Sequence, residues 1–322
     1  MSRLAVRTFF AALWISASCG SAQLPTSPEA APVAWDAVNA TLYARATANA
    51  AAAETDLIAL RRDIHRHPEL SKQEQRTAGI IADRLRALGL EVRTGIGGHG
   101  VVGILKGARA GSLIAYRADM DAFPSQEPDP SSVASENPGV RHICGHDLHV
   151  AVGLGLATAL APLRSELAGT FMFIFQPAEE TATGARAMLD AGVFSQEKPS
   201  AIFGVHTSAA AVGRIATRSG RMMNANAVAP GVVNDDALFA KAWSSLTTAL
   251  GADAVRDSGA PPEPFSEDFG HFQAQVPGVF FFLGASNPSA GLASYPHTAA
   301  FALDDRAIQF GVRAMAAVLL GV

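Results

Sequence analysis

Short apolar runs alternate with helical segments along most of the chain, and this alternation limits the possible folds more than any other feature. The runs are rich in β-branched and aromatic residues, which favours strands. They lie at residues 90–92, 101–105, 113–116, 171–175, 201–205 and 279–283. Helical patterns occur at residues 35–67, 72–88, 147–163, 182–191, 235–250 and 304–320. Alternating strands and helices predict a layered α/β fold.

Several positions predict how individual elements begin, end or pack. The run at 171–175 is almost fully apolar, as expected of a strand buried on both faces. Gly89 follows the helical pattern at 72–88 and predicts its C-terminal cap. Asp147 can cap the start of the helix that follows it. Residues 122–141 are rich in Pro, Ser and Glu, which predicts a loop.

Composition excludes some classes of protein. The chain has 322 residues, of which 49% are hydrophobic and 17% charged, so it is globular and long enough for a large core. The net charge is −4 and there is no long basic run. A nucleic-acid groove needs a cluster of Lys and Arg, so we expect no nucleic-acid partner.

The first 22 residues have the pattern of a signal peptide. Arg3 and Arg7 precede a short apolar run at 9–15, and Gly20-Ser21-Ala22 provides small residues for cleavage. We therefore expect an exported protein, periplasmic or secreted. An uncleaved anchor or a disordered tail is the alternative. The apolar run is too short to span a bilayer, so we expect no stable membrane insertion.

The chain contains two cysteines, and Cys19 lies within or at the edge of the predicted signal peptide. Cys144 is then alone, so the exported protein has no internal disulfide. A lone thiol in an oxidising compartment must be buried or bound. Ligation of a metal is one way to protect it.

Polar residues that can bind metals follow several of the apolar runs. In open α/β sheets ligands bind beyond the carboxyl ends of the strands, so these residues can meet at one edge. Cys144 and His146 supply a thiolate and an imidazole, which suit zinc, and the single glycine between them permits a tight turn. The alternative is a loop cysteine beside a histidine that starts a helix.

Two adjacent carboxylates, Glu179 and Glu180, come soon after the apolar run at 171–175. Such a pair is costly unless positive charge is near. Neighbouring side chains point in different directions, so one can bind metal while the other faces the substrate as a general base. Acidic residues that favour a helix N-terminus are the alternative.

Four further residues are less informative alone. Asp119 and Asp121 share a face in extended backbone and can orient ligand histidines or touch the metals, although an Asp-rich turn is equally compatible. His206 after its strand is compatible with a buried core histidine, and His297 alone indicates little. Together with the cysteine and the glutamates, these residues fit a two-metal hydrolytic site.

The same motifs carry a resemblance to a known family. The chain resembles the M20 metallopeptidases, in the branch of hippurate hydrolases and auxin-conjugate amidohydrolases. The matching pieces occur in the family's order and cover nearly the whole mature chain. They are Arg62-Asp63-Ile64-His65-Arg66-His67-Pro68-Glu69-Leu70, Arg117-Ala118-Asp119-Met120-Asp121-Ala122, His142-Ile143-Cys144-Gly145-His146-Asp147-Leu148-His149, Phe175-Gln176-Pro177-Ala178-Glu179-Glu180, His206, Ser266-Glu267-Asp268-Phe269 and His297-Thr298 with Phe301.

The resemblance implies a fold, an activity and roles for individual residues. The fold would be a layered mixed sheet flanked by helices, forming one catalytic domain over residues 23–322. Two divalent ions, Zn, Mn or Co, would serve the hydrolysis of the amide bond of N-acyl amino acids, related amides or short peptides. Glu179 would be the general base. The metal ligands would be Cys144, His146, Glu180, His206 and His297, supported by Asp119, Asp121, His149 and Glu267.

One family feature is missing from the sequence. Members usually carry an inserted lid domain that forms a dimer interface and brings a histidine to the site, in a motif like Gly-Gly-His-Ala. No such stretch occurs, and the insert is expected to be deleted near residues 224–231. Dimerisation through the lid is then not available. Loss of one oxyanion donor costs about 10²–10³ in rate.

This gap leaves three interpretations. The first is a reduced but active amidohydrolase with an open site. The second is a metal-binding relative that has lost turnover and serves as a binding module. The third is an incomplete gene product with no function of its own. Retention of every expected ligand and of the base favours the first.

Overall fold

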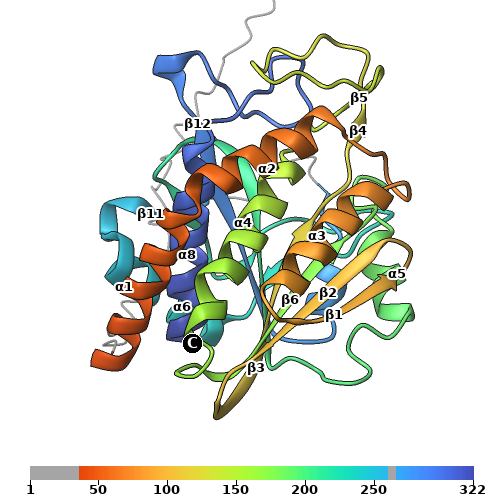
Figure 1. Cartoon of the computed structure of the whole chain (residues 1–322). Helices are drawn as coiled ribbons and strands as arrows, with labels where there is room; N and C mark the ends of the chain where they lie inside the picture. Colours follow the sequence, from red (N-terminus) through yellow and green to blue (C-terminus); the bar gives the residue numbers. More distant parts are fainter. Residues whose placement is uncertain (1–35, 260–265) are drawn as a thin grey trace, which may run out of the picture.

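A computed structural model of the chain describes residues 36–259 and 266–322 (Figure 1). The predicted signal peptide at 1–22 lies outside these residues. The helices are α1 (Ala37–Ala52), α2 (Glu54–Arg66), α3 (Gln75–Ala87), α4 (His146–Leu160), α5 (Gly184–Asp190), α6 (Asp236–Leu250), α7 (Gly270–Gln273) and α8 (Arg306–Gly321), with short 3₁₀ turns η1 (Ala161–Leu163), η2 (Ala252–Ala254) and η3 (Pro288–Ala290).

The main sheet has eight strands in the order β1-β2-β6-β3-β7-β12-β8-β11. Its strands are β1 (Glu91–Ile96), β2 (Gly100–Lys106), β3 (Arg109–Asp119), β6 (Ala168–Gln176), β7 (Ala201–Ala211), β8 (Ile215–Thr217), β11 (Val255–Asp257) and β12 (Gly278–Ser286). The central β6, β3, β7 and β12 are parallel, while β1, β2 and β8 pair antiparallel to their inner neighbours. The predicted layered mixed α/β sheet is confirmed.

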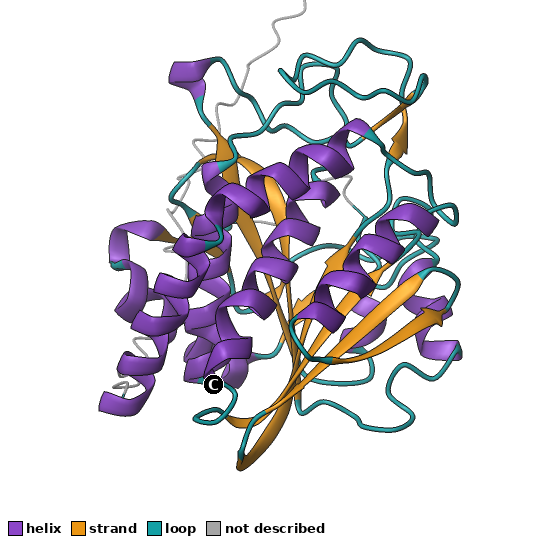
Figure 2. Cartoon of the chain, in the orientation of Figure 1, coloured by secondary structure: helices purple, strands orange, loops and turns teal. Residues whose placement is uncertain are grey.

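Both faces of the central strands are buried, because side chains alternate between two apolar layers. In β6, Phe173 and Phe175 belong to a core beneath α1, α2, α4 and α8, whereas Met172 and Ile174 belong to a second core with α5 and α7. Figure 2 shows the sheet with helices against it. The expectation that residues 171–175 form a strand buried on both faces is therefore confirmed.

Helix α4 is the central helix of the larger layer. Gly153 and Gly155 let it pack closely, since a Cβ at Gly155 would lie 2.6 Å from a methyl of Val312 on α8. Among the described residues, the stretch His146–Leu163 has the length and hydropathy of a membrane span, but 83% of it is buried within the fold. Its apolar surface is accounted for by packing against the sheet and its neighbouring helices.

Some expected boundaries differ from those observed. The helical pattern at 35–67 is two helices, because the chain leaves helical geometry at Ala53. The loop at 122–141 contains a short antiparallel pair, β4 (Phe123–Pro124) with β5 (Val140–Arg141). The prediction that Asp147 caps α4 is wrong. The capping position is Gly145, and the Asp147 carboxylate instead binds Arg61 and His65 of α2.

Candidate metal centre

The predicted ligands, the predicted base and Asp119 come from five separate segments that meet at one edge of the sheet. Asp119 ends β3, His206 lies in β7 and His146 is the first residue of α4. Glu179 and Glu180 follow β6, and His297 lies in the connection between β12 and α8. The carboxyl ends of parallel strands meet at this edge, as the fold class requires.

The five predicted ligands lie in overlapping clusters. Within each cluster, one ligand atom of every member lies within 4.8 Å of the others. The clusters are Cys144 with His146 and His206, Cys144 with Glu180 and His297, and His146 with Glu179 and Glu180. Cys144 belongs to the first two clusters, so its sulfur lies within 4.8 Å of donor atoms in both.

The turn around Gly145 explains how Cys144 and His146 reach the same place. Gly145 has a φ of 87°, in the left-handed region that glycine adopts readily. A Cβ there would lie 2.8 Å from the side chain of Thr207. Both restrictions exclude a larger residue, and the tight turn places the Cys144 sulfur 3.1 Å from Nε2 of His206.

Backbone strain accompanies the glutamate pair. Ala178 precedes Glu179 with a φ of 54°, a conformation that costs about 1–3 kcal/mol for a residue with a Cβ. The backbone N–H groups of Glu179 and Glu180 donate to the two carboxylate oxygens of Asp121 at 3.1 and 3.0 Å. This contact holds the turn in place, and the two glutamates contact different partners.

Glu180 faces His297, whose Nε2 lies 3.1 Å from its carboxylate. The His297 side chain is 46% exposed and packs against the ring of Phe123, with ring centroids 4.6 Å apart. Its φ of 57° is a second strained backbone position at the site. His297 therefore lies at the rim of the centre, while the other four predicted ligands are more deeply placed.

Two polar atoms of the predicted ligands support the binding of cations. Nε2 of His146 and Oε1 of Glu180 are buried and have no hydrogen-bond partner among the described residues. Buried polar atoms normally have partners. The donor set of one thiol, three imidazoles and a carboxylate suits zinc and neighbouring divalent metals. These residues therefore fit the expected pair of ions.

The electrostatics of the centre point the same way. Burial, and next the charge of Glu180, raises the pKa of the Cys144 thiol. Burial, and next the charge of Glu267, raises the pKa of the Glu179 carboxyl. Burial, and next His149, lowers the pKa of His206. For these three groups the protein alone thus disfavours the charged form, and a bound cation would favour deprotonated ligands.

Two of the predicted supporting residues, Asp119 and Asp121, lie beside the predicted ligand His146. Asp121 accepts a hydrogen bond from Nδ1 of His146 at 3.2 Å. Asp119 lies 2.5 Å from Nδ1 of His149 and 3.6 Å from Nε2 of His146. Burial would raise the pKa of Asp119, but Arg117, His146 and His149 hold it well below its usual range.

The comparison with protein families agrees with this geometry. The profile of peptidase family M20/M25/M40 matches residues 115–321. The chain belongs to this family. The resemblance predicted from the motifs is confirmed, and residues 115–321 include every candidate ligand and Glu179.

Individual relatives of this M20 chain match it in part. An N-acetylcysteine deacetylase of Bacillus subtilis is 45% identical over 176 residues, which cover 52% of this chain and 44% of the relative. Thermostable carboxypeptidase 1 of Saccharolobus solfataricus is 43% identical over 171 residues, which cover 52% of this chain and 43% of the relative. The chain thus matches less than half the length of these relatives.

A solved structure extends the likeness over more of the chain. The YXEP protein of Bacillus subtilis, described as a dinuclear metal binding peptidase from the M20 family, is 28% identical with a TM-score of 0.73. The match covers 84% of this chain and 98% of that chain. The observed sheet and its helices are therefore those of the M20 fold.

The sequence did not predict the role of Arg117, which is fully buried beside the centre. Its five N–H groups have five acceptors. Nε donates to Gln176 at 2.7 Å, Nη1 to Asp119 at 2.7 Å and Glu267 at 3.2 Å, and Nη2 to Glu267 at 2.9 Å and Asp268 at 3.1 Å. A charged residue inside an otherwise apolar strand was the available signal.

This guanidinium faces three carboxylates, so the cluster keeps an excess of negative charge. Burial raises the pKa of Glu267 to about 7 and of Asp268 to about 6, although Arg117 opposes both shifts. Glu267 and Asp268 also lie within 4.8 Å of Glu179, measured between ligand-capable atoms. Glu267, expected to support the site, therefore lies between Arg117 and the predicted base.

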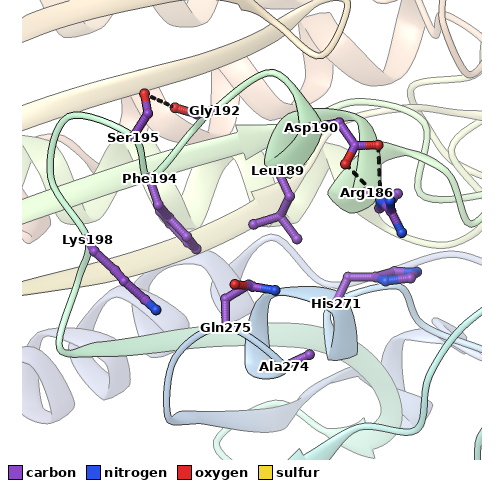
Figure 3. A pocket seen from close by; sticks show the side chains of 10 residues that line it. All are labelled: Arg186, Leu189, Asp190, Gly192, Phe194, Ser195, Lys198, His271, Ala274 and Gln275. Atoms are coloured by element: carbon purple, nitrogen blue, oxygen red, sulfur yellow. Dashed lines mark hydrogen bonds and ion pairs between the residues drawn. The ribbon is translucent and has the colours of Figure 1, made fainter.

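A cavity of about 240 Å³ opens onto the M20 centre. It is lined by Phe123, Cys144, Glu179, Glu180, His206, Ser266 and His297. A larger cavity of about 600 Å³ lies between α5 and α7, where Lys198, Gln275 and His271 line the space and Arg186 pairs with Asp190 (Figure 3). The larger cavity contains none of the predicted site residues.

Proposed function

We propose that this chain is a metal-dependent amidohydrolase that cleaves the amide bond of N-acyl amino acids or short peptides. One observation carries the proposal. Five ligand-competent side chains from distant segments lie in overlapping clusters with atoms within 4.8 Å, and Glu179 remains beside them as a further carboxylate. A stabilising role alone does not account for such a convergence of buried donors with unpaired atoms.

Cys144, His146, Glu180, His206 and His297 would hold two divalent ions. Bound in this site, such ions act as Lewis acids that lower the pKa of water and polarise an amide carbonyl. Zinc suits the thiolate and imidazoles best, while manganese or cobalt can use the same donors. Asp121 would orient His146 through the 3.2 Å contact with its Nδ1.

Glu179 would act as general base and then as general acid. Its carboxylate lies 3.8 Å from Nε2 of His146 and lines the cavity, so it can reach a water molecule beside that ligand. It would accept a proton from the attacking water and pass it to the amine nitrogen as the amide bond breaks. A carboxylic acid and a free amino acid result.

The substrate class is supported by the relatives. A substrate of a deacetylase for N-acetylcysteine and a substrate of a carboxypeptidase share one chemical unit. This unit is an amide whose nitrogen belongs to an amino acid with a free carboxylate. A cavity of about 240 Å³ accommodates the amide and small flanking groups. We therefore propose small N-acyl amino acids as the substrates.

A second candidate function is metal binding without turnover, and it rests on the segment between β9 (Gly220–Arg221) and β10 (Val233–Asn234). These two strands pair directly, and the described residues 222–232 between them contain no helix or strand. We propose that the family's inserted lid is missing here. The site would then be open, which is compatible with a loose substrate range or with metal binding that lacks turnover.

Purified protein loaded with zinc or manganese separates these functions. We expect two metal equivalents and turnover of a panel of N-acetyl amino acids and hippurate. Glu179→Gln should retain the metals and lose about 10²–10⁴-fold in kcat, because general acid–base catalysis is removed. The exposed Glu197→Gln is the matched control and should keep full activity. Bound metal without any turnover in the wild type would favour the binding module.

We also propose export, with residues 1–22 removed as a signal peptide. The support is the basic start, the short apolar run and the small residues before Gln23. Mass spectrometry of the protein from the periplasm or medium tests it. A mature N-terminus at Gln23 is expected, and an intact N-terminus on cytoplasmic protein would contradict export.

A further inference from the structure

We propose that Asp119 and His149 are positioning residues that hold Thr207, whose carbonyl fixes the tautomer of His206 and whose hydroxyl fixes the place of Cys144. The inference rests on the metal centre of the proposed function but not on turnover. It rests on a continuous chain of hydrogen bonds between buried groups. In each bond, the known donor or acceptor character of one partner determines where the proton of the other lies.

The chain begins at the buried guanidinium. Arg117 donates to Oδ2 of Asp119 at 2.7 Å, and this contact orients the carboxylate. The other oxygen, Oδ1, lies 2.5 Å from Nδ1 of His149. Asp119 and His149 are both fully buried. A carboxylate accepts and cannot donate, so Nδ1 of His149 must carry the proton.

The other nitrogen of His149 confirms this tautomer independently. The backbone N–H of Thr207 donates to Nε2 of His149 at 2.9 Å. A backbone N–H is always a donor, so Nε2 must be an acceptor without a proton. His149 is therefore neutral, with both nitrogens engaged. It cannot bind a metal through Nε2 without breaking its contact with Thr207, although its ring lies close to His146 and His206.

Thr207 transmits this constraint to two ligands. Nδ1 of His206 lies 2.8 Å from the carbonyl oxygen of Thr207, which can only accept, so His206 carries its proton on Nδ1. Its Nε2 then presents a lone pair toward the Cys144 sulfur at 3.1 Å. The hydroxyl of Thr207 donates to the carbonyl of Cys144 at 2.7 Å. One residue thus holds both His206 and Cys144.

The consequence is a division of roles between two histidines one helical turn apart. His146 offers an unpartnered buried Nε2 and serves as a ligand. His149 has no nitrogen to offer and orients the ligands on β7 and before α4. Hydrogen bonds to the far side of a ligand usually change metal affinity about 10- to 100-fold.

Replacement of His149 tests this role by a readout other than turnover. His149→Phe keeps the ring volume and removes both hydrogen bonds, whereas His149→Gln can still donate to Asp119 and accept from Thr207. We expect zinc affinity, measured by competition with a chromophoric chelator, to fall about 10- to 100-fold in the Phe variant and less in the Gln variant. His271→Phe, in the other cavity, is the control and should match the wild type.

Cobalt spectroscopy separates positioning from a loss of stability. In the cobalt-loaded protein, the thiolate-to-metal charge-transfer band reports the Cys144 ligand. We expect the band, normalised to folded protein, to shift or weaken in His149→Phe and to recover in His149→Gln. Wild-type spectra and affinities in both variants would overturn the proposal, as would a complete absence of metal binding by the wild type.

Imidazole nitrogen NMR of the zinc-loaded wild type keeps the proposal testable if the variants do not fold. The expected result is a proton on Nδ1 of both His149 and His206. A proton on Nε2 of either residue would overturn the proposal. Because this measurement needs no substrate, a protein that binds zinc with these tautomers but hydrolyses nothing would contradict only the proposed function.

Discussion

The two cavities of this protein differ in a way that volume does not reveal. The smaller, about 240 Å³, is lined by side chains from six separate segments of the chain, and Cys144, Glu179 and His206 among them are buried. The larger, about 600 Å³, is lined by half-exposed and exposed side chains from two stretches, residues 186–198 and 271–275. Convergence of buried donors, rather than space, therefore marks the chemical site.

The same contrast appears between Arg117, which lies beside the metal centre, and Arg186, which lines the larger cavity. Arg117 has no exposed surface and donates all five N–H groups to buried oxygens, four of which belong to three carboxylates. Arg186 is 65% exposed and pairs with Asp190, which is 61% exposed. Because the Arg117 cluster is removed from water, loss of any partner leaves a buried charge uncompensated. Solvent screens the attraction between Arg186 and Asp190, so that ion pair contributes little to stability.

The variants Arg117→Met and Arg186→Met test whether the two arginines differ in their contribution to stability. Arg117→Met leaves three buried carboxylates without their cation, so we expect the free energy of unfolding to fall by about 3–5 kcal/mol. Arg186→Met should change it by less than about 1 kcal/mol. Urea unfolding of the metal-free proteins measures both. Equal effects would show that burial does not distinguish the two cavities.

A pH dependence of stability should appear on the metal-centre side, at His65. Burial would lower the pKa of His65, but Asp147 and Asp129 raise it from 6.5 to about 9. The protonated form is bound more tightly in the folded state, so its stabilisation is complete below about pH 6.5 and is lost as pH rises towards 9.

The loss corresponds to about 3 kcal/mol, since one pKa unit is about 1.4 kcal/mol. Denaturant unfolding of metal-free protein at pH 6 and pH 9 measures it, and His65→Gln should flatten the dependence. His271 near the larger cavity has a lowered pKa, caused first by burial and then by Arg186, and His271→Gln is the control. An unchanged pH profile in His65→Gln would contradict the assignment.

Much of the centre was predictable because its motifs are local. The Cys144-Gly145-His146 turn and the pair Glu179-Glu180 are each contiguous, and their donor types indicate a divalent metal. The apolar run at 171–175 also predicted a strand buried on both faces. These features depend on residue type and short spacing, which the sequence states directly.

The unpredicted features depend on contacts between distant segments. Asp147 looks like a helix cap, yet Arg61 and His65 of another helix bind its carboxylate. Ala178 adopts a left-handed conformation that its residue type disfavours, because Asp121 holds the following N–H groups. Tertiary partners override local preference in both places.

The smallest effect is expected at the larger cavity. Lys198→Ala removes an exposed charge, so stability should change by no more than about 0.5 kcal/mol and turnover should stay at the wild-type level. Thermal unfolding and hydrolysis of N-acetyl amino acids check both. A large loss of activity would show that the larger cavity takes part in hydrolysis and would contradict the assignment of the active site to the smaller cavity.

Anomalous diffraction at the zinc edge from metal-loaded crystals would locate the bound ions directly. We expect two peaks in the cavity of about 240 Å³, at ligand distance from Cys144, His146, Glu180, His206 and His297. Peaks only between α5 and α7, or no peak beside Cys144, would contradict it.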